Sequence, residues 1–159
     1  ACTLHWIRND GDLVEGELLL LDAGIELDSL YTADVTRTLP INGTFSAGSQ
    51  GVSFVQGQRL RIEDCVITGM GSTGIADSAV ASELTILDTV VRDNGGAGIN
   101  LTVDASLLLD GVRVEHNAGD GVLVSATSNG ANATVRNSVL SYNGQAGIAA
   151  FMPPDPATT

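Results

Sequence analysis

Residues 84–99 read LTILDTVVRDNGGAGI, and this stretch is the clearest copy of a unit that recurs through most of the chain. A glycine followed by a branched aliphatic residue marks each copy, in steps of 23, 24, 23 and 26 residues. These pairs are Gly51-Val52, Gly74-Ile75, Gly98-Ile99, Gly121-Val122 and Gly147-Ile148. A period in the low twenties, built from short β-rich runs, predicts a solenoid whose coils stack around one core.

Other columns of residues keep the same phase along the chain. Paired aliphatic positions recur at Ile62/Ile67, Ile86/Val91, Leu109/Val114 and Val135/Leu140. Small or branched residues form another column at Cys65, Thr89, Val112 and Ser138. Because solenoid coils stack in register, each column predicts a row of side chains that runs along the solenoid axis.

Asparagine occupies one more column, four residues before the glycine, at Asn94, Asn117 and Asn143. Asparagine tolerates the left-handed backbone region, so one asparagine per coil predicts a tight bend at its position. Identical amide side chains stacked coil on coil can also hydrogen-bond along the axis. We therefore expect a structural ladder at these three positions.

The pattern resembles the right-handed parallel β-helix family, the architecture shared by pectate lyases and many secreted repeat proteins. The resemblance covers residues 51–151 and implies an all-β fold with about five coils. It is specific for the fold and says little about the chemistry. We assign residues 58–151 to the repeats and residues 152–159, which contain three prolines, to a tail, because proline lacks the amide hydrogen that a strand ladder needs.

The charge of the chain excludes one class of partner. The 159 residues carry a net charge of −12 and contain no lysine. Such a surface repels phosphate backbones, so we expect no nucleic-acid partner. No apolar run approaches the ~20 residues of a membrane span. The sequence does not indicate an oligomeric state.

The two cysteines, Cys2 and Cys65, lie far apart and do not have the spacing of a metal site. Their position favours a buried free Cys65 in the repeat column over a disulfide.

Residues 1–50 interrupt the repeat. Two apolar runs in this segment are each associated with an aspartate, Asp22 and Asp34. A hairpin is the simplest geometry for these runs. In a hairpin the two carboxylates project from adjacent strands toward one point, as a divalent metal site requires.

Three motifs in this segment are LHW at residues 4–6, GELLLLDAG at residues 16–24 and ADVTRTLPINGTFS at residues 33–46. They resemble the metallopeptidase family of aminopeptidase P and prolidase, the pita-bread enzymes that remove an N-terminal residue preceding proline. The resemblance implies that residues 1–46 are a truncated β-hairpin fragment of that domain. It also implies that Asp22 and Asp34 are metal ligands of a dinuclear Mn, Co or Zn centre, and that His5 is the active-site histidine.

The resemblance further implies a histidine and two glutamate ligands beyond the two aspartates. The later histidine of this chain is His116, inside a repeat. Glu63 is a further candidate ligand, because the stretch RIEDCVIT at residues 61–68 is similar to the strand that carries the family's last ligand. However, Ile62 and Ile67 are in phase with the repeats, which favours a structural role. We expect no cofactor to be required, and a metal pair only if the peptidase interpretation holds.

Residues 47–57 form the expected junction, where glycine and serine dilute the apolar pattern. The abrupt change of pattern there indicates a chimeric chain. The apolar N-terminal segment is a candidate cap, since the bare strand edges of an end coil otherwise pair with other chains. The compartment stays open, because the peptidase resemblance implies the cytoplasm and the β-helix resemblance implies secretion.

Three functions are compatible with these features. The favoured one is a non-catalytic β-helix scaffold or binding module, with a glycan as candidate partner, and we expect that the chain as it stands is not an enzyme. The first alternative is a metal-dependent Xaa-Pro aminopeptidase. The second is a polysaccharide lyase or hydrolase, for which Arg92, Arg113 and Arg136, in approximately one column, are the candidate basic residues. Several acidic residues are expected on solvated faces: Asp64, Asp88, Asp93, Asp104, Asp110 and Asp120.

Overall fold

β-Strands form all the regular structure in a computed structural model that describes residues 3–7, 18–21, 24–27, 35–38, 50–55, 57–102, 104–126 and 130–151. For the first four segments the backbone alone is described. Within these ranges no helix is long and apolar enough to cross a bilayer. The all-β fold predicted from the sequence is confirmed.

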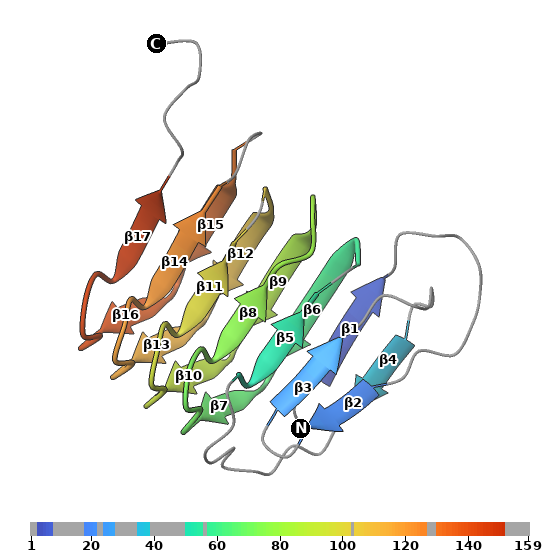
Figure 1. Cartoon of the computed structure of the whole chain (residues 1–159), viewed down its shortest axis with the longest axis horizontal. Coiled ribbons are helices and arrows are strands. Elements are labelled where there is room, and N and C mark those ends of the chain that lie inside the picture. The colour runs from blue at the N-terminus through green and yellow to red at the C-terminus, as the bar shows by residue number, and fades with distance from the viewer. Residues whose placement is uncertain are drawn as a thin grey trace.

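Parallel strands form three walls of a solenoid (Figure 1). The first wall consists of β6 (Arg59–Glu63), β9 (Glu83–Leu87), β12 (Ser106–Asp110) and β15 (Asn132–Arg136). The second wall consists of β7 (Val66–Thr68), β10 (Val90–Arg92), β13 (Arg113–Glu115) and β16 (Val139–Ser141). The third wall consists of β5 (Val52–Phe54), β8 (Ile75–Asp77), β11 (Ile99–Leu101), β14 (Val122–Ser125) and β17 (Ile148–Phe151).

The coil count is slightly lower than the sequence predicts. The first and second walls each contain four parallel strands and the third contains five, so the solenoid has about four coils. The expected count of about five included the copies that begin at Gly51 and at Gly147. The first of these supplies β5, β6 and β7, one strand to each wall, whereas the copy that begins at Gly147 contributes β17 alone within the described residues.

Four N-terminal strands extend two of the walls. They are β1 (Thr3–Ile7), β2 (Leu18–Leu21), β3 (Gly24–Leu27) and β4 (Val35–Thr38). β1 pairs antiparallel with both β6 and β4, and β3 pairs parallel with β5 and antiparallel with β2. The expected hairpin between the strands near Asp22 and Asp34 is therefore wrong, because β2 and β4 belong to different sheets. The hairpin partner of β2 is β3, which lies in the stretch expected to be a connection.

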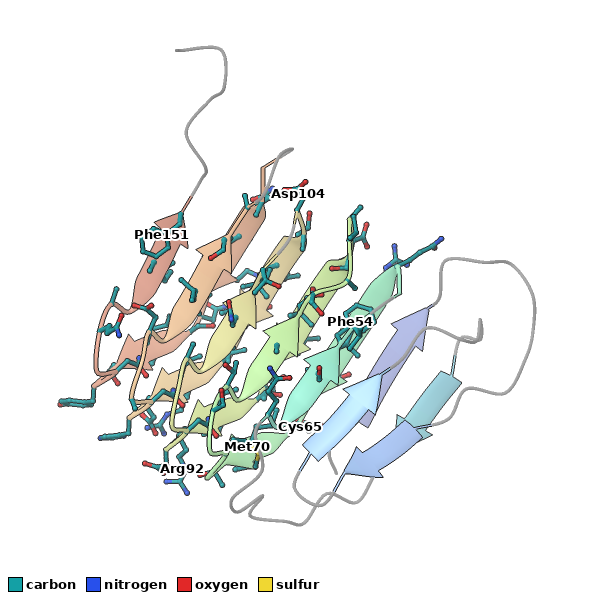
Figure 2. The ribbon with its side chains drawn as sticks, viewed as in Figure 1. Phe54, Cys65, Met70, Arg92, Asp104 and Phe151 are labelled. Carbon is teal, nitrogen blue, oxygen red and sulfur yellow. The ribbon has the colours of Figure 1, made fainter. Side chains whose placement is uncertain are left out.

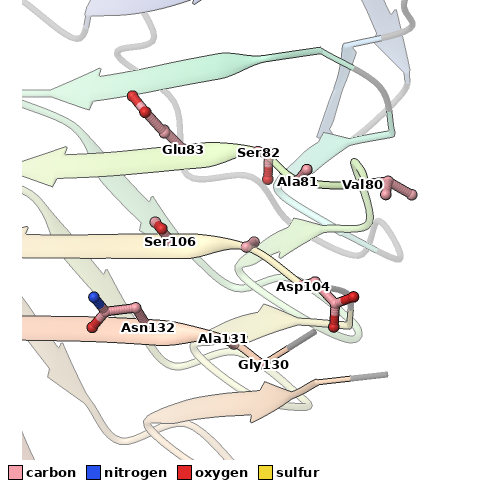
Figure 3. A pocket seen from close by; sticks show the side chains of 10 residues that line it. Val80, Ala81, Ser82, Glu83, Asp104, Ser106, Gly130, Ala131 and Asn132 are labelled. Atoms are coloured by element: carbon pink, nitrogen blue, oxygen red, sulfur yellow. The ribbon is translucent and has the colours of Figure 1, made fainter. Parts of the chain in front are cut away.

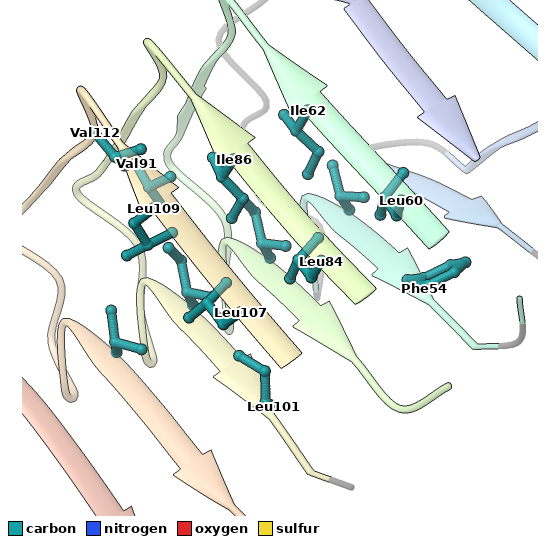
Figure 4. Close-up of a cluster of buried hydrophobic side chains, with 14 of the residues drawn as sticks. Phe54, Leu60, Ile62, Leu84, Ile86, Val91, Leu101, Leu107, Leu109 and Val112 are labelled. Carbon is teal, nitrogen blue, oxygen red and sulfur yellow. The ribbon is translucent and has the colours of Figure 1, made fainter. Parts of the chain in front are cut away.

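The core lies between the three walls and is almost entirely aliphatic (Figure 4). Alternate residues of each strand point inward, as the buried–intermediate–buried pattern of β8 and β11 shows. The predicted aliphatic columns are confirmed, because Ile62 pairs in register with Ile86, and Ile67 with Val91. Successive coils thus cover one another's inward side chains with like residues.

Two corners of every coil use the left-handed backbone region. The corner between the first and second walls has positive φ at Asp64, Asp88, Gly111 and Asn137. The next corner has positive φ at Gly69, Asp93, His116 and Tyr142. The left-handed residue thus precedes each asparagine of the ladder, whereas the bend was predicted at the asparagine itself. The asparagine is left free of that strain and uses its side chain for hydrogen bonding.

The third corner, between the third and first walls, is the place where the coils differ in length. It spans residues 55–58, 78–82, 102–105 and 126–131 in the four coils. The corner between the first and second walls has two residues in every coil, and the corner between the second and third walls has six. The unequal steps of the sequence repeat therefore arise at one side of the solenoid.

The expectation of a free Cys65 is wrong. Cys65 is buried, with 2% of its surface exposed, and it is disulfide-bonded. The chain contains one other cysteine, Cys2, which lies outside the described residues. Both free cysteines and disulfide-bonded cysteines are commonly buried, so burial alone did not distinguish the two states of Cys65.

Candidate functional site

A polar column runs along the outer edge of the first wall. It lies beside the corner between the third and first walls, which differs in length from coil to coil and is called the variable corner below. The first residues of β9, β12 and β15 are Glu83, Ser106 and Asn132, which are paired in register and exposed. Figure 3 shows the three side chains on successive strands. A carboxylate, a hydroxyl and an amide therefore follow one another at the inter-strand spacing of about 4.8 Å.

Two adjoining cavities share this column. The larger, of about 470 Å³, extends from the column over the variable corner. The smaller, of about 240 Å³, extends over the outer face of the first wall, beside Thr85, Leu108 and Thr134. Because both cavities are lined by Glu83, Ser106 and Asn132, we treat them as one groove.

Hydroxyl, amide, carboxylate and small apolar groups line the groove, and none of its lining residues is basic. Its acids are Glu83 and Asp104. Glu83 is bound at its edge by Arg59, whose Nε donates to Oε2 at 2.7 Å. This ion pair is more than half exposed on both sides, so solvent screens it and it contributes little to stability.

Asp77 lies buried beside the variable corner. Its side chain points inward from β8, in register with Phe54 and Leu101, and is fully buried. Ser82 donates from Oγ to Asp77 Oδ2 at 2.7 Å, and the Ala79 amide donates to Oδ1 at 2.9 Å. Burial raises the pKa of Asp77 to about 6, and the two hydrogen bonds offset part of that shift.

Asp77 was not predicted as a functional residue, although the repeat contains the signal for its burial. Asp77 is in register with the inward residues Phe54 and Leu101 of the adjacent coils. Its side chain must therefore also point into the core. The serine five residues later supplies the hydroxyl that a buried carboxyl requires.

One of the acids expected on a solvated face is buried instead. Asp120 is 7% exposed, and its Oδ1 accepts a hydrogen bond from the Ala146 amide at 2.9 Å. By contrast, Asp64, Asp88 and Asp93 are exposed. Asp110 is half-buried and binds Arg136 of the next coil, with 3.0 Å between Oδ2 and the guanidinium.

The candidate peptidase residues are not brought together within the described chain. Asp22 and Asp34 lie outside the described residues, and of His5 only the backbone is described, in β1 between Thr36 of β4 and Arg61 of β6. Glu63 ends β6 and forms an ion pair with Arg61 at 3.0 Å.

His116 lies at a corner of the second wall, where its ring stacks on Tyr142 with centroids 5.2 Å apart. The two rings belong to the left-handed residues of adjacent coils. Among the described side chains, no group of three or more His, Cys, Asp or Glu is arranged to hold a metal ion.

The asparagine column forms a continuous hydrogen-bonded row. Asn94 Nδ2 donates to Asn117 Oδ1 at 2.8 Å, and Asn117 Nδ2 donates to Asn143 Oδ1 at 3.0 Å. Each Oδ1 also accepts the backbone N–H of the preceding coil, which brings Met70 into the row. Both Asn94 and Asn117 are buried, so this row belongs to the core and not to a binding surface.

The three arginines considered for a lyase site do not share a column, contrary to expectation. In register, Arg92 lies beside Glu115, whereas Arg113 lies beside Val90 and Val139. Arg136 belongs to the first wall, beside Asp110. Each has an acidic partner, at 3.7 Å for Arg92 and Asp93, 2.9 Å for Arg113 and Glu115, and 3.0 Å for Arg136 and Asp110.

A family model described as "Right handed beta helix region" matches residues 28–152. No solved structure matches the chain.

The curated relatives that match a short segment of the chain are Xaa-Pro aminopeptidases. Xaa-Pro aminopeptidase 1 of Streptomyces coelicolor is 72% identical over 46 residues, which are 29% of this chain and 9% of that protein. The Xaa-Pro aminopeptidase of Haemophilus influenzae is 52% identical over 46 residues, 29% of this chain and 10% of that protein. Xaa-Pro aminopeptidase 3 of Homo sapiens is 33% identical over 95 residues, 58% of this chain and 18% of that protein. The chain thus spans about a tenth of the length of the first two relatives.

Proposed function

Because the chain belongs to the right-handed β-helix family, we propose that it is a non-catalytic β-helix scaffold whose groove binds a neutral, hydroxyl-rich glycan. The single observation that carries this proposal is the in-register column of Glu83, Ser106 and Asn132 along both cavities. Repeated polar groups at a fixed spacing suit a ligand that itself repeats hydroxyl groups along its length.

The charge of the groove selects among glycans. Its lining contains two carboxylates, Glu83 and Asp104, and no basic residue, which disfavours the carboxylates of a uronate chain, although Arg59 at the edge offsets part of the charge of Glu83. A neutral sugar avoids this repulsion and can donate hydroxyl hydrogens to the carboxylate and amide oxygens. The apolar side chains of Val80 and Leu108 offer contact for the C–H faces of such a sugar.

Residues 1–46 act in this proposal as an N-terminal cap on the first coil. The pairing of β1 with β6 and of β3 with β5 supports this role, because both pairings cover strand edges that would otherwise be open. The remaining parts are the junction at residues 47–57, the repeats at residues 58–151 and the tail at residues 152–159.

A non-catalytic role is favoured by the way in which the candidate ligands are used. Glu63 is in register with Leu87 of the next coil and is held by Arg61, and His116 is a corner residue of a later coil. These two residues thus serve strand and corner positions of the repeat. A dinuclear hydrolytic centre needs ligands beyond two aspartates, and the two candidates named here are engaged elsewhere in the repeat.

A glycan array with neutral and uronate polymers tests the proposed ligand. We expect neutral glycans to be bound, and the double variant Ser106→Ala/Asn132→Ala to weaken binding by about tenfold, the loss expected for two hydrogen bonds. Gln145→Ala is the matched control, because Gln145 is exposed and does not line the groove. Preferential uronate binding, or equal effects of the groove and control variants, would contradict the proposal.

The sequence identity with Xaa-Pro aminopeptidases over a short segment favours a second candidate function, that of a metal-dependent Xaa-Pro aminopeptidase. A separate experiment tests this function. The chain is incubated with a proline-containing dipeptide and Mn²⁺. Turnover that is abolished by Asp34→Ala would establish the peptidase and refute the non-catalytic role. We expect no turnover above the rate of the buffer with Mn²⁺.

A further inference from the structure

Asp77 places a carboxyl at a position where the adjacent coils have apolar side chains. It lies in register with Phe54 of β5 and Leu101 of β11, and all three side chains are fully buried. Figure 2 shows Phe54 inside the solenoid. The packing of the coils therefore does not require a carboxyl here, and an apolar residue would avoid the cost of burying one.

Ser82, which binds Asp77, lines the larger cavity of the groove. It precedes β9 in the position where Ala105 precedes β12 and Ala131 precedes β15, and all three residues line that cavity. Figure 3 shows Ser82 beside Glu83 at the start of β9. Within this row of three, Ser82 alone has a polar side chain. The two polar members of the pair thus occur in one coil, with one member in the core and the other against the cavity.

The hydrogen bond between the two side chains depends on a proton for its direction. Ser82 donates from Oγ to Asp77 Oδ2 at 2.7 Å, and the Ala79 amide donates to Oδ1 at 2.9 Å. An ionised carboxylate only accepts, so the hydroxyl hydrogen of Ser82 is committed to Oδ2. When Oδ2 takes up a proton from the solvent, it donates to Ser82 Oγ instead, and the hydroxyl hydrogen of Ser82 is released for another acceptor.

The surroundings of Asp77 favour uptake of that proton near neutral pH. Burial raises the pKa of Asp77 to about 6. The inward side chains of the strands around it are apolar and belong to one core cluster: Phe54 of β5, Leu60 of β6, Leu84 of β9 and Leu101 of β11. The charged groups of these strands and of the neighbouring corners lie elsewhere: Glu83 and Asp104 line the cavity, and Arg59, Arg61 and Glu63 occupy the outer positions of β6.

From this geometry we propose that Asp77 and Ser82 form a proton-operated contact of the groove, in which protonation of Asp77 frees the Ser82 hydroxyl to donate to an oxygen of a sugar in the larger cavity. The inference rests on the proposed binding of a neutral glycan. Ring and glycosidic oxygens of a sugar accept hydrogen bonds but cannot donate them, and the carboxylates of Glu83 and Asp104 offer them no hydrogen. A neutral glycan should therefore bind more tightly at acid pH, and by linkage its binding should make Asp77 hold the proton more firmly.

The test reads the array of neutral glycans at about pH 5 and about pH 7.5, on either side of the pKa of Asp77. We expect about fivefold tighter binding at the lower pH, the change that one net hydrogen bond produces. Asp77→Asn should bind at both pH values as the wild type does at pH 5. Its Nδ2 can donate to Ser82 as the protonated carboxyl does, while its Oδ1 still accepts from Ala79.

Asp93→Asn is the matched control and should keep the wild-type change with pH, because Asp93 is exposed at the corner between the second and third walls. Circular dichroism checks that each variant keeps its β spectrum. If Asp77→Asn does not, Ser82→Ala replaces it and should show the weaker binding at both pH values, because it removes the donor. Carbon NMR of the Asp77 carboxyl gives a second measurement, and its titration midpoint should rise when a bound glycan is added.

The possible outcomes separate this inference from the function on which it rests. A change with pH that persists in Asp77→Asn or Ser82→Ala overturns the proposal, because another group then causes it. Equal binding of wild type at both pH values also overturns it, and leaves glycan binding by the groove standing. Failure to bind any neutral glycan at either pH overturns both.

Discussion

Asn94 donates a hydrogen bond from Nδ2 to the Oδ1 of Asn117 at 2.8 Å, although 23 positions separate the two residues in the chain. Their backbones are linked as well, because the Asn94 amide donates to the same oxygen at 3.2 Å. The Oδ1 of Asn117 thus accepts hydrogen bonds from both the side-chain amide and the backbone amide of Asn94. The row ties each coil to the next at a corner where the strand ladder is interrupted.

Asn117→Ala should destabilise the fold by about 2–3 kcal/mol, since it leaves buried donors of Asn94 without an acceptor. Asn143→Ala should cost less, about 1 kcal/mol, because Asn143 lies at the half-exposed end of the row. Urea unfolding measures both changes. Asn132→Ala, an exposed residue, is the control and should change the free energy of unfolding by less than about 0.5 kcal/mol. Equal midpoints for Asn117→Ala and Asn132→Ala would contradict a stabilising row.

Gly121 and Gly147 occupy the same column but have different surroundings. A Cβ on Gly121 would lie 2.6 Å from the Gly147 carbonyl oxygen and 2.7 Å from Asn143 Nδ2. A Cβ on Gly147 would meet nothing closer than 3.6 Å. We therefore expect Gly121→Ala to lower the free energy of unfolding by about 1–3 kcal/mol.

Gly147→Ala serves as the matched control for that substitution. It should be neutral or slightly stabilising, because alanine reduces the freedom of the unfolded chain. Thermal unfolding of the two variants distinguishes the cases, and equal melting temperatures would show that no coil covers Gly121 from the C-terminal side.

Asp77 should make the stability of the fold depend on pH. Its pKa in the folded chain is about 6, against the usual 3.8, because burial disfavours the charged carboxylate. Between these values the folded state binds the proton more tightly than the unfolded state does, so this contribution to stability is full at low pH and is lost as pH rises. The loss through this window is on the order of 2–3 kcal/mol.

Asp77→Asn should therefore be more stable than the wild type at pH 7, and the difference should shrink toward pH 4. Urea unfolding across this range measures the difference. Asp93→Asn is the control, because Asp93 is exposed at a left-handed corner that asparagine also tolerates. A difference between Asp77→Asn and wild type that stays constant from pH 4 to pH 7 would refute the role of the buried carboxyl.

The disulfide of Cys65 predicts the thiol content of the chain. The unfolded protein should show no free thiol before reduction and two thiols after it, since the sequence contains two cysteines. Titration with a chromogenic disulfide measures this directly. Reduction should also lower the unfolding midpoint, because it releases a constraint on the unfolded state. Two titratable thiols in the unreduced protein would refute the bond.

The columns of the solenoid were predictable because identical spacing brings identical environments together. Ile62, Ile86 and Leu109 occupy one inward position in adjacent strands, and no other residue needs to be known to place them there. The left-handed corners were not predictable in the same way. Gly69, Asp93, His116 and Tyr142 share a backbone conformation but no side-chain chemistry, so the tertiary ladder imposes a φ that sequence preference alone does not indicate.

The pairing of the N-terminal strands was missed for a different reason. The pattern of two apolar runs, each with an aspartate, suggested that the strands near Asp22 and Asp34 pair with each other. Instead, β3 pairs with the open edge of β5 and β1 with that of β6, because a solenoid offers long unpaired edges at its first coil. Local motifs describe the strands, but the available edges decide their partners.

The restriction of length variation to the corner between the third and first walls has a consequence for how such a chain diversifies. Extra residues at 78–82 or 126–131 lengthen a loop while the strands on both sides keep their partners. The two-residue turns after the first wall have the same length in every coil, and an extra residue that entered the following strand there would turn its inward side chains outward. New recognition surfaces can therefore accumulate most readily along the rim of the groove, where the coils already differ in length.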